Sequence, residues 1–240
     1  MDFSNQFTKI ETDDSLMETV SHGDKAYPFS YYYENLALYD FHCVDWHWHN
    51  EFEFVFVESG EVSCDIGSTH FMLHPGQAIM INSKVLHRFQ SESDAITPNF
   101  LFNPSFISPA ESLIYEKYVN PVLSSSLEYV IFQKDIAWQS VALDIIKNII
   151  KLQDASDNRE ISVSINVQQL WLLLLENLSF ESFEDQTTIN SRARLQLMMQ
   201  YIHAHFAESI SLEDIANSVA ISKSSALHLF QTGIKMTHNN

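Results

Sequence analysis

The chain has 240 residues, of which 45% are hydrophobic and 12% are aromatic, so it is long enough to bury a substantial core in one or two domains. Its longest apolar run, at 170–178, is shorter than the roughly 20 residues of a membrane-spanning helix, and its N-terminus has no signal-peptide pattern. The two cysteines, Cys43 and Cys64, exclude a disulfide framework. We therefore expect a cytoplasmic protein with no membrane partner.

Charge divides the chain into two unequal parts. The formal net charge is −18, which argues against nucleic-acid binding by the chain as a whole, because contacts with phosphate require Lys and Arg. Residues 191–240 differ from the rest, because they contain four basic and three acidic residues. This asymmetry indicates a division of labour between an acidic body and the C-terminal part.

Residues 31–90 are predicted to form short strands. Aromatic and β-branched runs alternate there with the turn residues SG at 59–60, GS at 67–68 and PG at 75–76, and the second of these predicts a two-residue hairpin. Many short strands at this spacing indicate a barrel or a sandwich.

The stretch HWHNEFEFVFV at 47–57 is read as one of these strands. Alternate residues of a strand share a face, so one face is polar and then aliphatic, and the other is aromatic. The first face holds His47, His49, Glu51, Glu53, Val55 and Val57, and the second holds Trp48, Phe52, Phe54 and Phe56. We expect both faces to be buried, with the polar face lining a cavity that His87 enters from a facing strand.

The spacing His47-x-His49-x3-Glu53-x6-Gly60 resembles the first cupin motif, and HPGQAIMINSKVLHRF at 74–89 resembles the second, with His87 in the place of its histidine. In metal-dependent cupins the four corresponding side chains hold iron, manganese, nickel or zinc, and imidazoles with a carboxylate suit these ions. The resemblance implies an effector-binding pocket without a cofactor, or alternatively a divalent metal site, and core packing is the third interpretation. The residues in question are His47, His49, Glu53 and His87.

Two residues depart from the second cupin motif. Proline and glycine usually stand five and three residues before its histidine, whereas this chain has Asn82 and Lys84. A lysine ammonium close to a divalent ion is repulsive unless it points outward. An effector pocket is therefore predicted ahead of a metal site.

From about residue 107 the pattern changes to that of helices. Residues 135–153 have one apolar face, formed by Trp138, Val141, Ile145 and Ile149. Residues 165–178 are apolar around most of the helix, which implies contacts on more than one side. We expect a homodimer through this region or, alternatively, packing onto the barrel, by Leu170, Leu173, Leu174 and Leu178. Residues 180–191 are read as an exposed linker.

The C-terminal part predicts an amphipathic helix at 192–209, followed by two short capped helices. The apolar positions of the first are Leu195, Met198, Met199, Ile202 and Phe206. Ser211 can cap a helix that begins at Leu212, with Asp214 at the capping-box position. Ser222 can cap the next helix, with Ser225 three residues on.

These two short helices predict a helix-turn-helix. A tight turn at 219–221 separates them, and the small Ala216 stands where they must cross closely. The residues expected to be buried between them are Ile215, Val219, Ile221, Leu227 and Phe230.

The stretch ISLEDIANSVAISKSS at 210–225 resembles the first helix-turn-helix of the AraC family of transcriptional regulators, and the order of the parts upstream also fits that family. The resemblance implies an α+β multi-domain chain with a cupin-like β-barrel at 1–106, a helical linker and dimerisation region at 107–185, and the first helix-turn-helix of a DNA-binding domain at 191–240. The family pattern continues into a second helix-turn-helix, whereas this sequence stops at Asn240. A natural truncation and a fragment of a longer protein are both compatible with that.

This resemblance implies that the second helix enters the major groove of DNA, where its outward side chains reach base edges. The expected DNA-contacting residues are Lys223, Ser224, Ser225, His228 and Gln231. His228 stands where relatives often have arginine, and a largely neutral imidazole weakens a phosphate or guanine contact. The alternative for all five is a solvated helix face.

Taken together, the sequence predicts a ligand-responsive, sequence-specific DNA-binding transcriptional regulator and not an enzyme. Its expected partners are operator DNA, a second copy of the chain, and an effector that the resemblance suggests is a sugar or another small metabolite. Trp46 and Trp48 are suited to stacking on a carbohydrate, and equally to core packing. Two alternatives stay open: a metal-dependent cupin enzyme such as an oxygenase or isomerase, and a dimerisation module without DNA binding.

Overall fold

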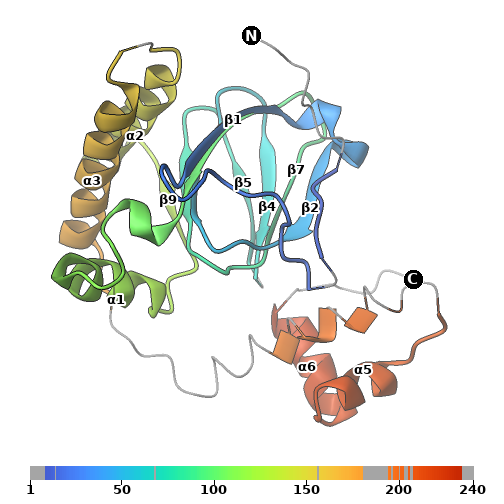
Figure 1. Cartoon of the computed structure of the whole chain (residues 1–240). Coiled ribbons are helices and arrows are strands. Elements are labelled where there is room, and N and C mark those ends of the chain that lie inside the picture. Colours follow the sequence, from blue (N-terminus) through green and yellow to red (C-terminus); the bar gives the residue numbers. More distant parts are fainter. Residues whose placement is uncertain are drawn as a thin grey trace.

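The computed structural model describes residues 9–13, 15–67, 69–155, 157–180 and 208–233, with 194, 195, 197–199, 201, 202 and 205 between the last two ranges. Its strands form two antiparallel sheets, and two long helices lie beside them (Figure 1). Two further short helices, α5 and α6, form a separate group near the C-terminal end (Figure 1).

The larger sheet has the strand order β1-β8-β3-β6-β9 and the smaller one has the order β2-β7-β4-β5. The strands of the larger sheet are β1 (Phe29–Asn35), β8 (Ile96–Phe102), β3 (Phe52–Phe56), β6 (Ala78–Ile81) and β9 (Tyr129–Phe132). Those of the smaller sheet are β2 (Cys43–His47), β7 (His87–Gln90), β4 (Val62–Ile66) and β5 (Thr69–Leu73). Short helical turns connect them: the 3-10 helices η1 (Leu36–Leu38), η2 (Asp40–His42) and η3 (Pro104–Phe106), and the π-helix η4 (Tyr115–Val119).

The two sheets face each other and do not close into a single barrel, so the expected barrel is corrected to a two-sheet sandwich. The stretch 47–57, which was predicted as one strand, is divided between the two sheets. The chain leaves β2 after His47, turns at 49–51 and enters β3 at Phe52, so its two halves belong to different sheets.

The predicted alternation along β3 is confirmed. Phe52 and Phe54 lie in the core between the larger sheet and the helices, whereas Val55 lies in the core between the two sheets. Phe54 stacks on Phe100 of the neighbouring β8, with ring centroids 5.1 Å apart. Both faces of β3 are therefore buried, each against a different layer.

Helices α2 (Ala137–Leu152) and α3 (Arg159–Asn177) cover the outer face of the larger sheet (Figure 1). The buried residues of α2 are Gln139, Ala142, Leu143, Ile146 and Ile149, so the predicted face is wrong in part: Val141 is 52% exposed. The small Ala142 faces the sheet in its place, which allows a close approach of helix and sheet. Within the range expected to be helical, residues 129–132 instead form β9, which pairs with β6.

Helix α3 packs onto the sandwich through Val163, Val167, Leu170, Trp171 and Leu174. The indole N–H of Trp171 donates a hydrogen bond of 2.9 Å to the carbonyl oxygen of Tyr118, just ahead of helix α1 (Asn120–Leu123). Leu170 and Leu174 are therefore core residues of this chain. This agrees with the predicted alternative in which these leucines pack onto the strands of the same chain.

The predicted turns at Gly60, Gly67 and Gly76 all have positive φ angles. Gly60 has the strictest requirement, because a Cβ atom there would lie 2.5 Å from the carbonyl oxygen of Asp94. This close approach explains why only glycine fits the end of the first motif. Ser68 of the predicted hairpin lies outside the described residues.

The capped helices predicted near the C-terminus are present as α5 (Leu212–Ser218) and α6 (Lys223–Gly233). Ser211 and Asp214 form the predicted capping box, and the Ser222 hydroxyl accepts a hydrogen bond of 3.1 Å from the backbone N–H of Ser225. The small core of this part contains Leu195, Met198, Ile215, Ala216 and Ala226, with Val219, Ile221 and Phe230 packed against it. Leu227 was expected to be buried and is 43% exposed, because Ala226 faces the core in its place. Phe206 and most of the predicted linker lie outside the described residues.

Among the helices of the described residues, none combines the length and the apolar character needed to cross a membrane.

Candidate functional site

The four residues singled out in the sequence come together at the edge of the two sheets. His47 ends β2, His49 lies in the turn before β3, Glu53 points inward from β3, and His87 begins β7. Their side chains are between 0% and 6% exposed, and one potential ligand atom of each lies within 4.8 Å of those of the other three. The predicted entry of His87 into the same space is confirmed.

All three imidazoles are oriented by the backbone. The Nδ1 atom of His47 lies 2.8 Å from the carbonyl oxygen of Asp45, and that of His87 lies 2.8 Å from the carbonyl oxygen of Val85. The Nδ1 atom of His49 lies 3.2 Å from the carbonyl oxygen of Glu51. A carbonyl can only accept, so each Nδ1 carries the proton and each neutral imidazole presents an Nε2 lone pair.

Two of these lone pairs, those of His49 and His87, converge on a carboxylate. Oε2 of Glu53 lies 3.1 Å from Nε2 of His87 and 3.4 Å from Nε2 of His49. None of these three buried atoms has a hydrogen-bond partner among the described residues, and with Nδ1 protonated the two Nε2 atoms have no hydrogen to donate to the carboxylate. Electron-rich atoms in contact without a proton or cation between them are unfavourable in a buried site.

The electrostatics of the cluster favour this arrangement of lone pairs at neutral pH. Burial alone would raise the pKa of Glu53, but the proximity of His49 and His87 outweighs burial and lowers the pKa. Burial, together with the neighbouring His87 and His49, holds the pKa of His47 well below its usual value. Glu53 is therefore ionised and His47 neutral.

The donor set fits a divalent transition metal. Three imidazoles and one carboxylate suit zinc, iron, nickel or manganese. Two atoms bound to one ion at about 2.1 Å lie roughly 3.0–3.4 Å apart, and the two measured separations from Glu53 Oε2 fall in that range. The carbonyl partners of the three Nδ1 atoms are the kind of support that metal-binding histidines usually have.

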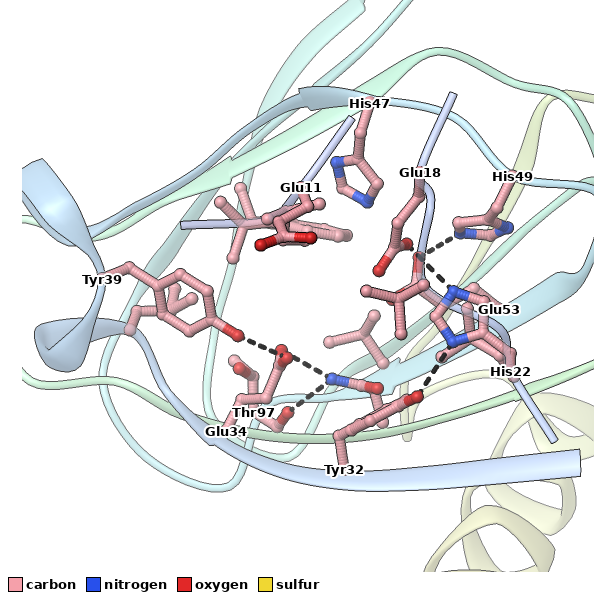
Figure 2. Close-up of a pocket in the computed structure, with 18 residues that line it drawn as sticks. Glu11, Glu18, His22, Tyr32, Glu34, Tyr39, His47, His49, Glu53 and Thr97 are labelled. Carbon is pink, nitrogen blue, oxygen red and sulfur yellow. Dashed lines mark hydrogen bonds and ion pairs between the residues drawn. The ribbon is translucent and has the colours of Figure 1, made fainter. Parts of the chain in front are cut away.

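Three residues of the cluster, His47, His49 and Glu53, line a small cavity of about 50 Å³ (Figure 2), and His87 contacts Glu53 without being one of the lining residues. Aliphatic and aromatic side chains line its floor, and its polar lining residues are Glu11, Glu18, His22, Tyr32, Glu34, Tyr39, His47, His49, Glu53, Thr97 and Asn99. A volume of this size holds a few water molecules. The lining described contains four glutamates and no Lys or Arg.

A second polar group lies across the cavity from the histidines (Figure 2). Glu34 of β1 lies 2.6 Å from the hydroxyl of Tyr39 and 2.7 Å from the amide nitrogen of Asn99. Burial raises the pKa of Glu34 to about 7, although those hydrogen bonds act in the opposite direction. Glu34 is therefore a carboxyl group that changes its protonation near neutral pH.

The N-terminal segment, residues 15–22, closes another side of the cavity. His22 lies 3.0 Å from a carboxylate oxygen of Glu18 and 3.0 Å from the hydroxyl of Tyr32. Burial would lower the pKa of His22, but Glu18 and the nearby carboxylates outweigh it and raise the pKa. The ring of His22 also lies edge-on to His49, with centroids 5.7 Å apart.

The two departures from the second cupin motif have separate explanations. Lys84 has a positive φ of 62°, a conformation that suits the glycine of the motif, and its side chain is exposed and so does not face the cluster. Asn82 is buried and donates hydrogen bonds to the carbonyl oxygens of Val122 and Leu127, at 2.9 and 2.8 Å. Neither residue conflicts with a cation in the pocket.

The stacking expected of Trp46 and Trp48 is not supported. Neither residue lines the cavity. Trp48 donates its indole N–H to the carbonyl oxygen of Ser15 at 2.7 Å, and Trp46 lines a different groove.

Several pocket residues were missed in the sequence. Tyr32 and Glu34 alternate along β1 and pair across the sheet with Asn99 and Thr97 of β8. Polar residues at alternate positions of an otherwise apolar strand were the available signal. Glu18 and His22 carried no such signal, because they reach the pocket from outside any named strand.

The predicted DNA-contacting residues form an exposed set on α6. Lys223, Ser224, Ser225, His228 and Gln231 are all exposed, whereas Ala226 is buried. The structure therefore leaves these five side chains on the surface of the helix, which both a DNA-contacting role and a solvated face require.

Replacing Glu34 by glutamine tests the ionisation of that group. The folded state holds the proton up to a pH of about 7, whereas the unfolded chain releases it near 4.5. With rising pH between these values, the free energy of unfolding of the wild type should fall relative to that of Glu34→Gln, by up to about 3 kcal/mol. Urea unfolding of chelator-treated protein between about pH 4.5 and 8 measures this.

The exposed Glu92→Gln is the matched control and should follow the wild type. A wild-type stability that stays constant or rises with pH, relative to Glu34→Gln, would contradict a buried, protonated carboxyl group.

Comparison with known proteins places this pocket in a family. The model of the AraC-like ligand binding domain matches residues 32–175, more than half of the chain. The uncharacterized HTH-type transcriptional regulator YdeC of Bacillus subtilis (strain 168) is 28% identical over 229 residues, which are 94% of this chain and 78% of that protein.

Solved structures give weaker likenesses. The AraC-like transcriptional activator CuxR is 12% identical, with 76% of this chain and 61% of CuxR covered and a TM-score of 0.37. ToxT of Vibrio cholerae is 8% identical, with 91% and 97% covered and a TM-score of 0.38. Oxalate decarboxylase of Bacillus subtilis is 21% identical over only 25% of this chain and 18% of the enzyme, with a TM-score of 0.24. The match over residues 32–175 identifies this chain as a member of the AraC family, with an AraC-like ligand-binding domain.

Proposed function

We propose that the chain is a ligand-responsive transcriptional regulator that senses a ligand in the buried pocket and contacts operator DNA with α6. The observation that carries this proposal is the buried cluster of three imidazoles and a carboxylate inside an AraC-like ligand-binding domain, in which His49, Glu53 and His87 each have a polar atom without a hydrogen-bond partner among the described residues. Unpaired buried polar atoms are costly, so three of them kept together in one cluster support a role in binding a ligand.

The proposed ligand site is a divalent metal site. His47, His49 and His87 would offer their Nε2 lone pairs and Glu53 its Oε2 atom, while the backbone holds the rings in place. A bound ion would neutralise the carboxylate and act as a Lewis acid toward a coordinated oxygen. A sugar effector is larger than the present cavity of about 50 Å³, so it would require the pocket to open.

The proposed DNA-contacting surface is the exposed side of α6. The helix begins beside the Ser222 cap, so its first residues stand at the end that a recognition helix directs into the major groove. One helix pair with little positive charge binds weakly by itself, and two copies on one operator would raise the effective affinity.

The proposed homodimer uses the outer side of α3. Ile161, Ile165 and Leu172 are each at least half exposed, and their spacing places them on one stripe of the helix. Such a stripe is typical of a helix that packs against a second helix. This surface takes the place of Leu170 and Leu174, which the core of the chain already buries.

A second candidate is a metal-dependent enzyme, and the same buried cluster favours it. An enzyme needs an open coordination position and room for a substrate next to the ion. Family membership favours sensing, and steady consumption of dioxygen by the metal-loaded protein would favour an oxygenase instead.

Metal binding is expected at one ion per chain. Protein loaded with Zn²⁺ or Mn²⁺ and then desalted should retain one equivalent by elemental analysis, and Glu53→Gln and His87→Ala should each retain much less. His70→Ala is the matched control, because His70 is an exposed histidine on β5 and its loss should leave the stoichiometry unchanged. Wild-type protein without retained metal would rule out the site.

DNA binding is expected to depend on α6 and on salt. In gel shifts with the DNA upstream of its own gene, Lys223→Ala should weaken binding and lower the salt slope by about one. Gln231→Ala should cost about 1–3 kcal/mol on the preferred sequence and less on others. Lys147→Ala, which removes the same charge from α2, should leave binding unchanged. Absence of binding at both low and high salt would favour an interaction module without DNA binding.

Dimerisation is expected to depend on the stripe on α3. Ile165→Lys should convert a dimer into a monomer in light scattering at micromolar concentration, since it places a charge inside the interface. Met72→Lys on β5 is the control, because Met72 is also an exposed apolar residue but lies on the smaller sheet. A wild-type chain that is monomeric, or an Ile165→Lys dimer, would contradict this interface.

A further inference from the structure

The charge of the pocket indicates what kind of ligand acts as the signal. We propose that the divalent ion is itself the effector, so that the chain is a metal-responsive regulator; this inference rests on the function proposed above. The cavity lining holds Glu11, Glu18 and Glu53, as well as Glu34 with its raised pKa of about 7, and no Lys or Arg among the described residues. Such a lining attracts cations and repels anionic metabolites.

The size of the pocket supports the same conclusion. About 50 Å³ accommodates an ion with a few coordinated waters and leaves no space for an organic molecule of drug or sugar size, which usually occupies a pocket of at least about 300 Å³. Floor residues such as Leu36, Val55 and Phe89 are packed in the core between the sheets and limit expansion in that direction. The ion alone fits the pocket as it stands.

The four ligand residues connect the two sheets. His47 and His87 belong to the smaller sheet, Glu53 belongs to the larger one, and His49 lies in the turn that joins them. Without a cation, lone pairs from both sheets face each other at 3.1 and 3.4 Å and repel. With a cation bound, these residues hold the two sheets together. Binding of the ion therefore replaces repulsion between the sheets with attraction at this edge.

The residue between two of the ligands holds the N-terminal segment. The backbone N–H of Trp48 donates to the carbonyl oxygen of Leu16 at 2.9 Å, and the carbonyl oxygen of Trp48 accepts from the N–H of Glu18 at 2.9 Å. The indole N–H of Trp48 donates to Ser15. Residues 15–18 therefore follow any movement of His47 and His49.

The N-terminal segment and the C-terminal part of the chain line one groove. The groove is lined by Lys9, Ile10, Thr12, Leu16, Asp45, Trp46, Met199 and Ile202. Met199 and Ile202 come from the helical residues ahead of α5, and Ile202 packs against the small core that carries α5 and α6. Hydrogen bonds thus connect the residue between two ion ligands to Leu16, and Leu16 lines the same groove as Met199 and Ile202 from the part of the chain that we assign to DNA.

The test uses the full chain with Zn²⁺, Mn²⁺ or Ni²⁺ as the only added ligand, compared with chelator-treated protein. Amide hydrogen exchange at Trp48 and Glu18 should slow by at least about tenfold when one ion is bound, while exchange in β9 at the far edge of the larger sheet should not change. DNA affinity at fixed salt should change by at least about fivefold between the two forms.

Glu53→Gln, which keeps the size of the side chain, should lose both responses, and His70→Ala should keep both. One bound ion per chain with unchanged exchange and unchanged DNA affinity would overturn the inference and make the ion a resident cofactor. Failure to bind any of the three ions would also overturn it. Loss of DNA binding in both forms would refute the proposed function, and the exchange response would then decide the inference on its own.

Discussion

The alternation of side chains along β3 is the constraint on which the rest of the structure depends. Phe52 and Phe54 require a helical layer on one side, and Glu53 and Val55 require a second sheet on the other. One strand thereby specifies three layers and places a carboxylate in the middle one. A buried carboxylate needs partners. His49 in the turn before β3 and His87 at the start of β7 provide them, and the Nδ1 atom of each imidazole donates a hydrogen bond to a backbone carbonyl oxygen.

The pocket combines groups that are individually unfavourable in an apolar interior. Glu34 accepts hydrogen bonds from the hydroxyl of Tyr39 and the side-chain amide of Asn99. His22 is hydrogen-bonded to Glu18 and Tyr32. These two groups are satisfied within the protein, whereas the imidazole and carboxylate cluster is not. Glu34 and His22 therefore shape and close the cavity, whereas the imidazole and carboxylate cluster is the part of the pocket suited to bind a ligand.

Much of this organisation was readable in the sequence, because period-two alternation and capping residues act locally. The burial of both faces of β3, the entry of His87 and the caps at Ser211 and Ser222 were all predicted correctly. The exchange of sheets between His47 and Phe52 was not, because the alternation that predicts one strand was read through the turn at 49–51, where Asn50 is the typical turn residue. In each of two helices an alanine is buried where the neighbouring larger residue was expected to be: Ala142 instead of Val141, and Ala226 instead of Leu227. Which residue is buried depends on how closely the helix approaches the layer it packs against, and the helix sequence alone does not determine that distance. The roles of Glu18 and His22 depend on long-range packing and left no local signal.

The separation of the ligand residues along the chain has a consequence for how the protein acquires its structure. Three of them lie within a few residues of each other, but His87 arrives only after β4, β5 and β6 have been added between them. An incompletely folded chain therefore lacks the full donor set, and loop closure must precede assembly of the site. A ligand that requires all four residues binds the finished sandwich and not its precursors, so by mass action it stabilises the native state selectively and protects the completed fold from unfolding.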